Sequence, residues 1–344
     1  MNAAKQFLLN CLLIPGFPAS FRYIQRQCST IFMLHRFHEP ERGITGCSAA
    51  HLRQALTYLA KNGYELVGLT ELFERLAGRG PEPRGAVAFT IDDGYIDQAI
   101  VAAPVFAEFD CPVTTFVSTG FLDGRLWLWW DQIEYIFENT ARTWVQVELA
   151  DARLSYRWEN EDDRKQAQSA FTERCKRVTQ AEKLAAISRL AHAAEVAFPS
   201  TPPSHCAPMS WDQLRACERM GMTFGPHTVT HPVLARATAD QARSEIVDSW
   251  NRLRAEAQSP VRVFCYPNGG WDDFGDREVK VLRELGFVGA VVAEPGYASG
   301  DDFRRASDGP YRVQRFGMPD DMPHLVQYVS GVERLKQLAL QRAG

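Results

Sequence analysis

The chain has 344 residues, of which 45% are hydrophobic and 23% are charged, and its formal net charge is −4. This composition is typical of a globular protein, and the length allows one large domain or two smaller ones. The acidic balance argues against a protein that binds nucleic acid, because such binding needs a basic face.

The eight cysteines are widely spaced, and no two of them form a CxxC pair. This spacing excludes a zinc finger. In a chain of this length, reduced thiols in the core are a better interpretation than a framework of disulfides.

The N-terminus, MNAAKQFLLNCLLIPGFPAS, contains an apolar run of about eleven residues, which is too short to span a bilayer. One lysine precedes the run and Asn10 interrupts it, so it makes a poor signal peptide. We interpret residues 1–28 as an N-terminal helical segment packed on the body of the protein. Two alternatives remain open: peripheral contact of residues 6–17 with the inner membrane surface, or a cleaved signal peptide.

Strand and helix patterns then alternate along the chain. Residues 29–37, STIFMLHRF, form a short apolar run with β-branched residues and predict a buried strand. Residues 48–63 have leucines at helical spacing between a serine start and a glycine stop. Residues 64–69 then predict a strand and 70–80 a helix, and the pattern repeats with a strand at 85–93 and a helix at 95–110. Residues 111–119 predict a further strand.

The alternation resumes after residue 206. Helices are predicted at 210–221, 238–258 and 276–286, and strands at 222–231, 261–270, 287–296 and 310–317. Repeated βα units with nearly continuous apolar strands imply a parallel sheet covered by helices. The number of strands suits a barrel better than an open sheet. The predicted fold class is therefore α/β, a distorted (β/α) barrel with about seven parallel strands.

An insertion interrupts this barrel pattern between residues 121 and 205. Its alternating segment at 144–158 predicts a β-hairpin, and a polar helical run extends from 161 to about 197. We expect residues 29–320 to form one barrel domain that carries this mixed hairpin and helical insertion. Residues 321–344 are expected to form a C-terminal helix.

Two motifs with polar side chains stand where strands are expected to end. FTIDDG places Asp92 and Asp93 side by side after an apolar run, where their like charges repel. GPHTVTHP places His227 and His231 four residues apart, in a loop that we expect to turn into a helix at Pro232, with His231 near the cap. In βα folds, the carboxyl ends of the strands carry the catalytic groups.

One carboxylate and two imidazoles make a set of three ligands that leaves the fourth position of a zinc ion open for water. Such a cation would relieve the repulsion between the two aspartates. Only one aspartate needs to touch the metal, which frees the other to act as a base. A pair of chance surface histidines is the alternative, which the strand-end position disfavours.

The residues resemble a known family at this point. FTIDDG and HTVTH resemble signatures of the polysaccharide deacetylases (NodB homology, carbohydrate esterase family 4), and FCYPNGGWDD is similar to their third motif. LRELGFVGAVVAEPGYAS and PYRVQRFGMP resemble the segments that close the domain. FMLHRFH resembles the entry strand of the subgroup that includes the poly-N-acetylglucosamine deacetylases. The resemblance covers about residues 29–120 and 206–320 and omits the insertion.

The resemblance implies a role for each matching residue. Asp93, His227 and His231 match the metal ligands, with Zn²⁺ or another divalent metal such as Co²⁺ or Ni²⁺ as the cofactor. Asp92 matches the catalytic base, and His35 matches the general acid, with His38 as the fallback. Asn268 stands where the family has a tyrosine whose backbone N–H helps to form the oxyanion hole, and an asparagine keeps that backbone donor.

The sequence also departs from the family pattern. Cys265 occupies the position of an arginine that orients the base in many members, so either Arg315 or another group must support Asp92. Trp127, Trp129 and Trp130 either stack on sugars or fill the core of the insertion, and we favour the core, with one of them at the cleft. His205 and His324 are expected to be structural or exposed.

The implied function is metal-dependent removal of an acetyl or formyl group from an amino sugar. The substrate is expected to be an N-acylated glycan, with a polyprenyl-linked sugar as the preferred class, because no export signal is convincing. The expected location is the cytoplasm, with the inner face of the membrane as an option. Three alternatives stay open: an O-acyl esterase or non-sugar amidase on the same site, an inactive glycan-binding barrel, and a membrane-associated scaffold.

Overall fold

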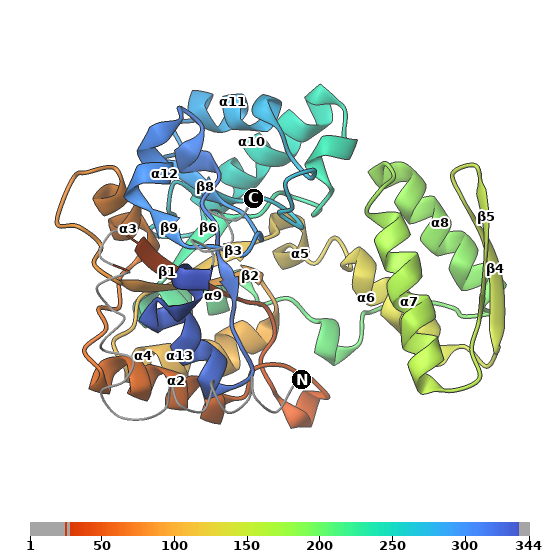
Figure 1. The fold of residues 1–344 in the computed structure, drawn as a ribbon. Helices are drawn as coiled ribbons and strands as arrows, with labels where there is room; N and C mark the ends of the chain where they lie inside the picture. The colour runs from red at the N-terminus through yellow and green to blue at the C-terminus, as the bar shows by residue number, and fades with distance from the viewer. Residues whose placement is uncertain (1–24, 26–27, 337–344) are drawn as a thin grey trace.

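The computed structural model describes residue 25 and residues 28–336, and its centre is a barrel of parallel strands (Figure 1). Five strands pair in the order β10-β1-β2-β3-β6, all parallel. Strands β7 and β8 form a parallel pair, and single bridges connect Phe224 with Pro260 and Val291 with Val313. The bridges link this pair to both edges of the sheet, so the predicted distorted barrel is confirmed.

The strands are short, and they coincide with the predicted apolar runs. Their bounds are β1 Cys28–Leu34, β2 Val87–Asp93, β3 Val113–Val117, β6 Met222–Pro226, β7 Val263–Cys265, β8 Gly289–Val291 and β10 Phe316–Gly317. The short β9 (Ala298–Ser299) pairs antiparallel with β1. Every residue of β2 and β3 is buried, as expected of parallel strands covered on both faces.

Helices surround the barrel and begin at the polar caps that the sequence predicts. Ser48 caps α2 (Ala49–Lys61), Ser210 and Gln213 form a capping box at α9 (Trp211–Arg219), and Thr238 caps α10 (Ala239–Glu256). The remaining helices of the barrel are α3 Leu69–Leu76, α4 Ala103–Glu108, α5 Thr119–Leu122, α11 Asp276–Glu284, α12 Gly300–Arg305 and α13 Met322–Ser330.

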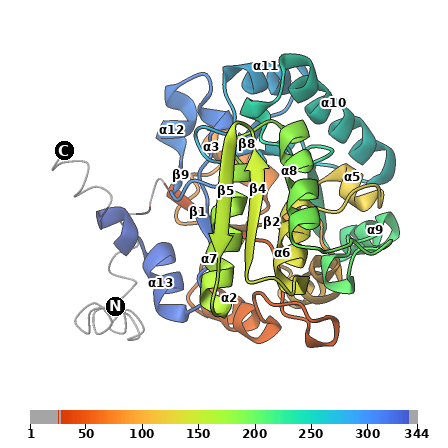
Figure 2. The same cartoon turned by 90° about the vertical axis from the view of Figure 1, so that its right-hand side faces the viewer.

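The insertion forms a lobe of its own beside the barrel, at the right of Figure 1 and facing the viewer in Figure 2. It consists of α6 (Trp129–Asn139), the predicted hairpin β4–β5 (Trp144–Leu149 and Ala152–Arg157), α7 (Glu161–Cys175) and α8 (Gln180–Ala193). The alternating pattern of β4 turns Val145, Val147 and Leu149 inward. They join Phe137 and Phe171 in a hydrophobic core separate from those of the barrel.

Several predicted elements differ from the structure. The segment 64–69 is not a strand and contributes only a bridge between Leu66 and Val87. The polar helical run from 161 to about 197 is divided into two helices, because the chain turns at residues 176–179 between α7 and α8. The predicted C-terminal helix begins at Met322 and is interrupted by Gly331, whose φ is +90°.

The prediction that a helix begins at Pro232 was wrong. Residues 227–233 form a loop, and the next helical turn, η5 (Leu234–Arg236), has three residues and is capped by Val233 rather than His231. His231 lies within this loop and has a positive φ of +55°.

The predicted N-terminal helical segment, including residues 6–17, lies outside the described residues apart from Gln25 and the start of β1. Among the helices that the structure describes, none is long and apolar enough to cross a membrane.

Candidate active site

The register of the sheet brings the two predicted motifs to the same end of the barrel. Asp93 is paired with Val117 on β3, and Val117 is paired with Pro226 on β6. His227 follows Pro226 directly, and its backbone N–H donates to the carbonyl oxygen of Val117. Because adjacent strands lie about 4.8 Å apart, the side chains of Asp93 and His227 can meet across β3.

The chain turns sharply at Asp93 so that its carboxylate faces this end of the barrel. Asp93 has a φ of +86° and Gly94 a φ of +99°, both in the left-handed region. A Cβ atom at Gly94 would lie 2.5 Å from Cδ1 of Leu122, so a larger residue would have to displace that side chain in addition to adopting this strained φ. Thr228, His231 and Asn268, all beside the same site, also have positive φ. The site is therefore built on backbone that ordinary residues rarely adopt.

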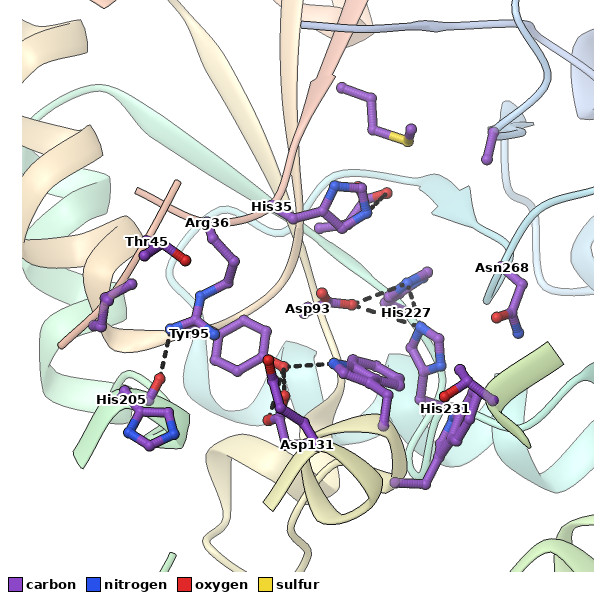
Figure 3. Close-up of a pocket in the computed structure, with 18 of the residues that line it drawn as sticks. His35, Arg36, Thr45, Asp93, Tyr95, Asp131, His205, His227, His231 and Asn268 are labelled. Atoms are coloured by element: carbon purple, nitrogen blue, oxygen red, sulfur yellow. Dashed lines mark hydrogen bonds and ion pairs between the residues drawn. The ribbon is translucent and has the colours of Figure 1, made fainter. Parts of the chain in front are cut away.

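Asp93, His227 and His231 converge in one buried cluster (Figure 3). Oδ1 of Asp93 lies 3.7 Å from Nε2 of His227 and 3.5 Å from Nε2 of His231, and the two Nε2 atoms are 3.1 Å apart. Nδ1 of His227 lies 2.7 Å from the carbonyl oxygen of Cys265, which can only accept, so this nitrogen carries the proton. Nε2 of His227 therefore presents a lone pair to the cluster.

These donors fit a divalent cation. Burial lowers the pKa of His227 to about 4, and burial together with His227 lowers the pKa of His231 well below its usual value. Both imidazoles are therefore neutral, as metal ligands must be. Burial and the charge of Asp92 raise the pKa of Asp93 well above its usual value, and a cation would offset that penalty.

Groups behind the ligands hold the loop that carries the two histidines. Glu245 on α10 accepts the backbone N–H groups of Val229 and Thr230 at 2.8 Å and 2.9 Å, and its other oxygen accepts the Thr230 hydroxyl at 2.6 Å. Such second-layer contacts fix the orientation of metal ligands. The role of Glu245 was missed, since nothing in the sequence of α10 distinguishes this glutamate from others on the helix.

Arg315 supports Asp92, which settles the alternatives that the sequence left open. Nη1 and Nη2 of Arg315 each lie 2.8 Å from a carboxylate oxygen of Asp92, and both side chains are buried. Burial alone would raise the pKa of Asp92, but the charge and hydrogen bonds of Arg315 outweigh it and hold this pKa well below its usual range. Asp92 is therefore ionised and held in a fixed orientation.

Cys265 completes the surroundings of Asp92. Its Sγ lies 3.5 Å from Oδ2 of Asp92 and 3.2 Å from Nη2 of Arg315. Burial raises the pKa of Cys265 well above its usual value, so the group is a thiol that donates to Asp92. A cysteine can stand here because Arg315, directly before β10, already supplies the positive charge beside Asp92.

His35 follows β1 and faces the same cavity. Its Nε2 lies 3.9 Å from Oδ2 of Asp92, and its side chain is 46% exposed. The protein around the ring nevertheless lowers the pKa of His35, mainly by desolvation, while Asp92 opposes this shift. Gln98, in the π-helical turn η3 (Gln98–Ala102), donates to the backbone oxygens of His35 and Asp92 and ties the two strand ends together. The fallback, His38, is exposed and lies outside this cavity.

Asn268 lies across the site from His35 (Figure 3) and lines the same cavity. Its φ is +60°, a conformation that asparagine tolerates better than most residues. This gives a physical reason for asparagine in a tight turn at this position.

The reacting groups open into a cavity of about 680 Å³, and the inserted lobe forms one of its walls. Trp130 of α6 packs its ring edge-on against His231, with centroids 4.6 Å apart, and donates its Nε1–H to the hydroxyl of Tyr95. The same hydroxyl donates to Asp131, which is buried. Burial raises the pKa of Asp131 to about 7, although the hydrogen bond from Tyr95 lowers it in part.

On the barrel side of the cavity, the side chain of Arg36 makes several contacts that the sequence did not predict. Arg36 packs over the ring of Tyr95 at 3.8 Å, pairs with the buried Asp97 and donates to the backbone oxygen of His205. Asp97 and Gln98 follow the FTIDDG motif by a few residues. Their closeness to that motif is the signal that could have found them.

The three tryptophans of the insertion have different environments in the structure. Trp129 belongs to the core of the lobe and also lines the cavity, whereas Trp130 lies at the cavity wall. Trp127 packs edge-on against Tyr135 and Phe198, away from the reacting groups. His205 lines the cavity as well, and His324 of α13 pairs with Asp321, the residue that caps this helix.

Comparison with known proteins agrees with this architecture. Residues 189–290 match the family model described as polysaccharide deacetylase. That segment contains His227, His231 and Asn268, while Asp92 and Asp93 lie outside it. No curated protein matches the chain.

Solved structures share the fold over most of their length. The Streptococcus pyogenes deacetylase PplD, in complex with acetate, is 18% identical with a TM-score of 0.56, covering 88% of this chain and 98% of that one. IcaB from Ammonifex degensii is 18% identical with a TM-score of 0.54, covering 88% and 97%. A de-N-acetylase from Aggregatibacter actinomycetemcomitans is 13% identical with a TM-score of 0.51, covering 86% and 96%.

These findings confirm the predicted resemblance to the polysaccharide deacetylase family and the predicted fold class. The fold is a distorted NodB-type barrel.

Proposed function

We propose that this protein is a divalent-metal-dependent deacylase that removes an acetyl or formyl group from an amino sugar of a glycan. The observation that carries the proposal is the meeting of Asp93, His227 and His231 beside the Asp92–Arg315 pair, in a cavity that His35 also lines. The family match and the related fold support the class of reaction.

Asp93, His227 and His231 would hold the metal, with zinc as the preferred ion and cobalt or nickel as alternatives. A divalent cation in this position supplies Lewis acidity, which makes water more acidic and polarises the acyl carbonyl.

The neighbouring residues divide the proton transfers of amide hydrolysis between them. Asp92, kept ionised by Arg315, accepts the proton that water loses when it attacks the acyl carbon. The backbone N–H of Asn268 donates to the oxygen on which negative charge develops. His35 donates a proton to the leaving amine, without which the amine is too basic to depart.

The proximity of Asp92 and His35 supports a route for the proton. Their closest atoms are 3.9 Å apart, so the proton that Asp92 takes from water can pass to His35, which is neutral at rest because desolvation lowers its pKa, and from His35 to the leaving amine. Each turnover would then consume one water molecule and release the acid and the free amine.

The cellular context remains part of the proposal. We propose a glycan on a polyprenyl carrier as the preferred substrate and the cytoplasm, at the inner face of the membrane, as the location. The apolar run at residues 6–17 is the support for membrane contact. Recovery of the protein from a secreted or periplasmic fraction would overturn this location.

Release of acetate and formate from a panel of N-acylated oligosaccharides and lipid-linked sugars tests the function directly. The wild type with added Zn²⁺ would be compared with metal-free protein and with Asp92→Asn. We expect release of the acid together with an equal amount of new amine, and loss of both without metal or without Asp92. Acid released without an amine would indicate an O-acyl esterase. Zinc binding without any release would favour a glycan-binding barrel.

A further inference from the structure

The ladder between β1 and β2 ends one position before the proposed acid and base. Its last paired residues are Leu34 and Ile91, so His35 and Asp92 occupy the next position of the two strands. Residues at the same position of parallel strands point to the same face of the sheet, which brings both side chains to the cavity. Beyond the ladder, the separation of the two strand ends depends on other contacts.

The side-chain amide of Gln98 bridges these strand ends. Its Nε2 donates to the backbone oxygen of His35 at 2.7 Å and to that of Asp92 at 2.5 Å. Both acceptors are carbonyl oxygens, which cannot donate, so the nitrogen of the amide must be the atom that faces them. Both hydrogens of that nitrogen are then used, and the amide is fixed in this orientation.

Packing alone does not account for a glutamine at this position. Gln98 is fully buried, and its Oε1 has no hydrogen-bond partner among the residues that the structure describes. An unpaired buried acceptor lowers stability, so the two hydrogen bonds of Nε2 must offset that cost. Gln98 also begins η3, a π-helical turn, and such turns are rare and frequently lie at functional sites.

The preceding residue holds the same segment at a second point. Asp97 is fully buried, and its carboxylate accepts the backbone N–H of Phe37 at 2.6 Å. Asp97 thus binds the chain beyond His35, whereas Gln98 joins His35 directly to Asp92. The two consecutive side chains fix the chain after β1 against the end of β2.

Resting on the proposed function, we propose that Gln98 is a positioning residue whose amide bridge sets the separation of His35 and Asp92, across which the proton moves toward the leaving amine. Nε2 of His35 lies 3.9 Å from Oδ2 of Asp92, and a shift of either strand end would widen this gap. A displacement of about 1 Å can slow a reaction roughly 100-fold. Gln98 does not line the cavity, so it acts through these two residues.

Two substrates with different leaving groups separate this role from a purely structural one. The amine of an N-acetylglucosamine tetrasaccharide needs a proton to leave, whereas the nitrophenolate of 4-nitrophenyl acetate leaves without one. Gln98→Met keeps a side chain of similar size and removes the donor. In the zinc-loaded variant, acetate release from the tetrasaccharide should fall roughly 10- to 100-fold, and ester hydrolysis should change less than about threefold.

Three further variants control this comparison. His35→Gln should show the same pattern, and adding Gln98→Met to it should lower amide hydrolysis no further. Gln132→Met is the matched control, because Gln132 also donates its side-chain N–H to a backbone oxygen, that of Trp127, outside the cavity. Both of its rates should equal those of the wild type. Zinc bound at one ion per chain would show that a variant is folded, and Gln98→Asn, with an amide one carbon shorter, replaces Gln98→Met if that protein does not fold.

Crystal structures of the wild type and the Gln98 variant test the geometry without turnover. We expect His35 to lie farther from Asp92 in the variant than in the wild type, or to occupy more than one position. An unchanged His35, or equal losses on the two substrates, would overturn the proposal. Failure of the proposed function shows separately, as absence of acyl release from every N-acylated sugar by the wild type.

Discussion

Buried charged side chains have hydrogen-bond partners at the end of the barrel, whereas one in the described part of the inserted lobe has none. At the barrel end, Asp92 accepts two hydrogen bonds from Arg315, and Asp97 pairs with Arg36. In the lobe, Lys183 is fully buried and its Nζ has no hydrogen-bond partner among the described residues. The comparison indicates that the protein itself fixes the reacting groups, whereas the buried charge of Lys183 reduces the stability of the lobe.

The largest effect is expected at the barrel end, from replacement of the proposed base. Asp92→Asn keeps the shape of the side chain and removes the proton acceptor, so acyl release should fall roughly 10²- to 10⁴-fold. Zinc binding should persist, because Asp92 is not among the proposed ligands. Steady-state kinetics with a zinc assay would measure both, with the exposed Asp151→Asn as the control. Activity close to the wild type would remove Asp92 from the mechanism.

A cavity in the core of the lobe should affect the stability of the lobe without affecting the barrel. Phe171 is fully buried among the lobe's hydrophobic residues, so Phe171→Ala should destabilise the lobe by about 3–5 kcal/mol. Oligosaccharide affinity should fall, while zinc affinity stays unchanged because all three ligands lie on the barrel. Chemical unfolding and zinc titration would measure these effects, with the partly exposed Phe198→Ala as the control. Loss of zinc binding together with the lobe would mean that the two regions unfold as one.

The unpaired lysine of the lobe predicts a pH-dependent stability. Burial lowers the pKa of Lys183 to about 8, against about 10.4 in an unfolded chain. Between these values the unfolded chain binds more protons, so stability should rise with pH across this window. Below about pH 8 the charged lysine should cost on the order of 3 kcal/mol, reduced by its contact with the ring of Trp129.

Lys183→Met, which keeps the volume and removes the charge, should therefore be more stable than the wild type at pH 7. The difference in unfolding free energy should shrink as the pH approaches 10, and urea unfolding of both proteins across this range would measure it. A difference that does not change with pH would show that Lys183 is not the group responsible.

The smallest effect is expected behind the metal ligands. Glu245→Gln removes the negative charge, keeps one acceptor oxygen for the backbone N–H groups of Val229 and Thr230, and puts an amide donor where an oxygen accepts the Thr230 hydroxyl. The loop that carries His227 and His231 should loosen, and zinc affinity should fall roughly 10- to 100-fold. Competition with a chelator would measure it, and Asp248→Asn, exposed on the same helix, is the matched control. Unchanged zinc affinity in Glu245→Gln would mean that the loop keeps its conformation without the contacts of Glu245.

Sequence reasoning predicted the barrel better than the lobe for a physical reason. Parallel strands buried on both faces require apolar runs such as those around Phe89 and Phe116, and the residues that follow them must meet at one end. Asp93, His227 and His231 could thus be grouped before the structure was known. Arg315 could be named only as one alternative for the support of Asp92, and Glu245 could not be found, because it lies on a distant helix with no local pattern that sets it apart.

In the lobe, the sequence predicted elements but not their relation to the cavity. The alternation in β4 indicated a hairpin, and Trp129 and Trp130 indicated a core or a sugar contact. Their separate environments depend on how α6 meets the barrel, through the hydrogen bonds of Tyr95 with Trp130 and Asp131. That contact joins residues more than thirty positions apart, beyond the reach of any periodic pattern.

The most direct test of the central claim is a zinc titration of metal-free protein during acyl release from an N-acetylated oligosaccharide. The account predicts release that rises with bound zinc and reaches a plateau at one ion per chain, and no release from His231→Ala at the same zinc concentration. Equal release from metal-free protein, or from His231→Ala, would contradict it.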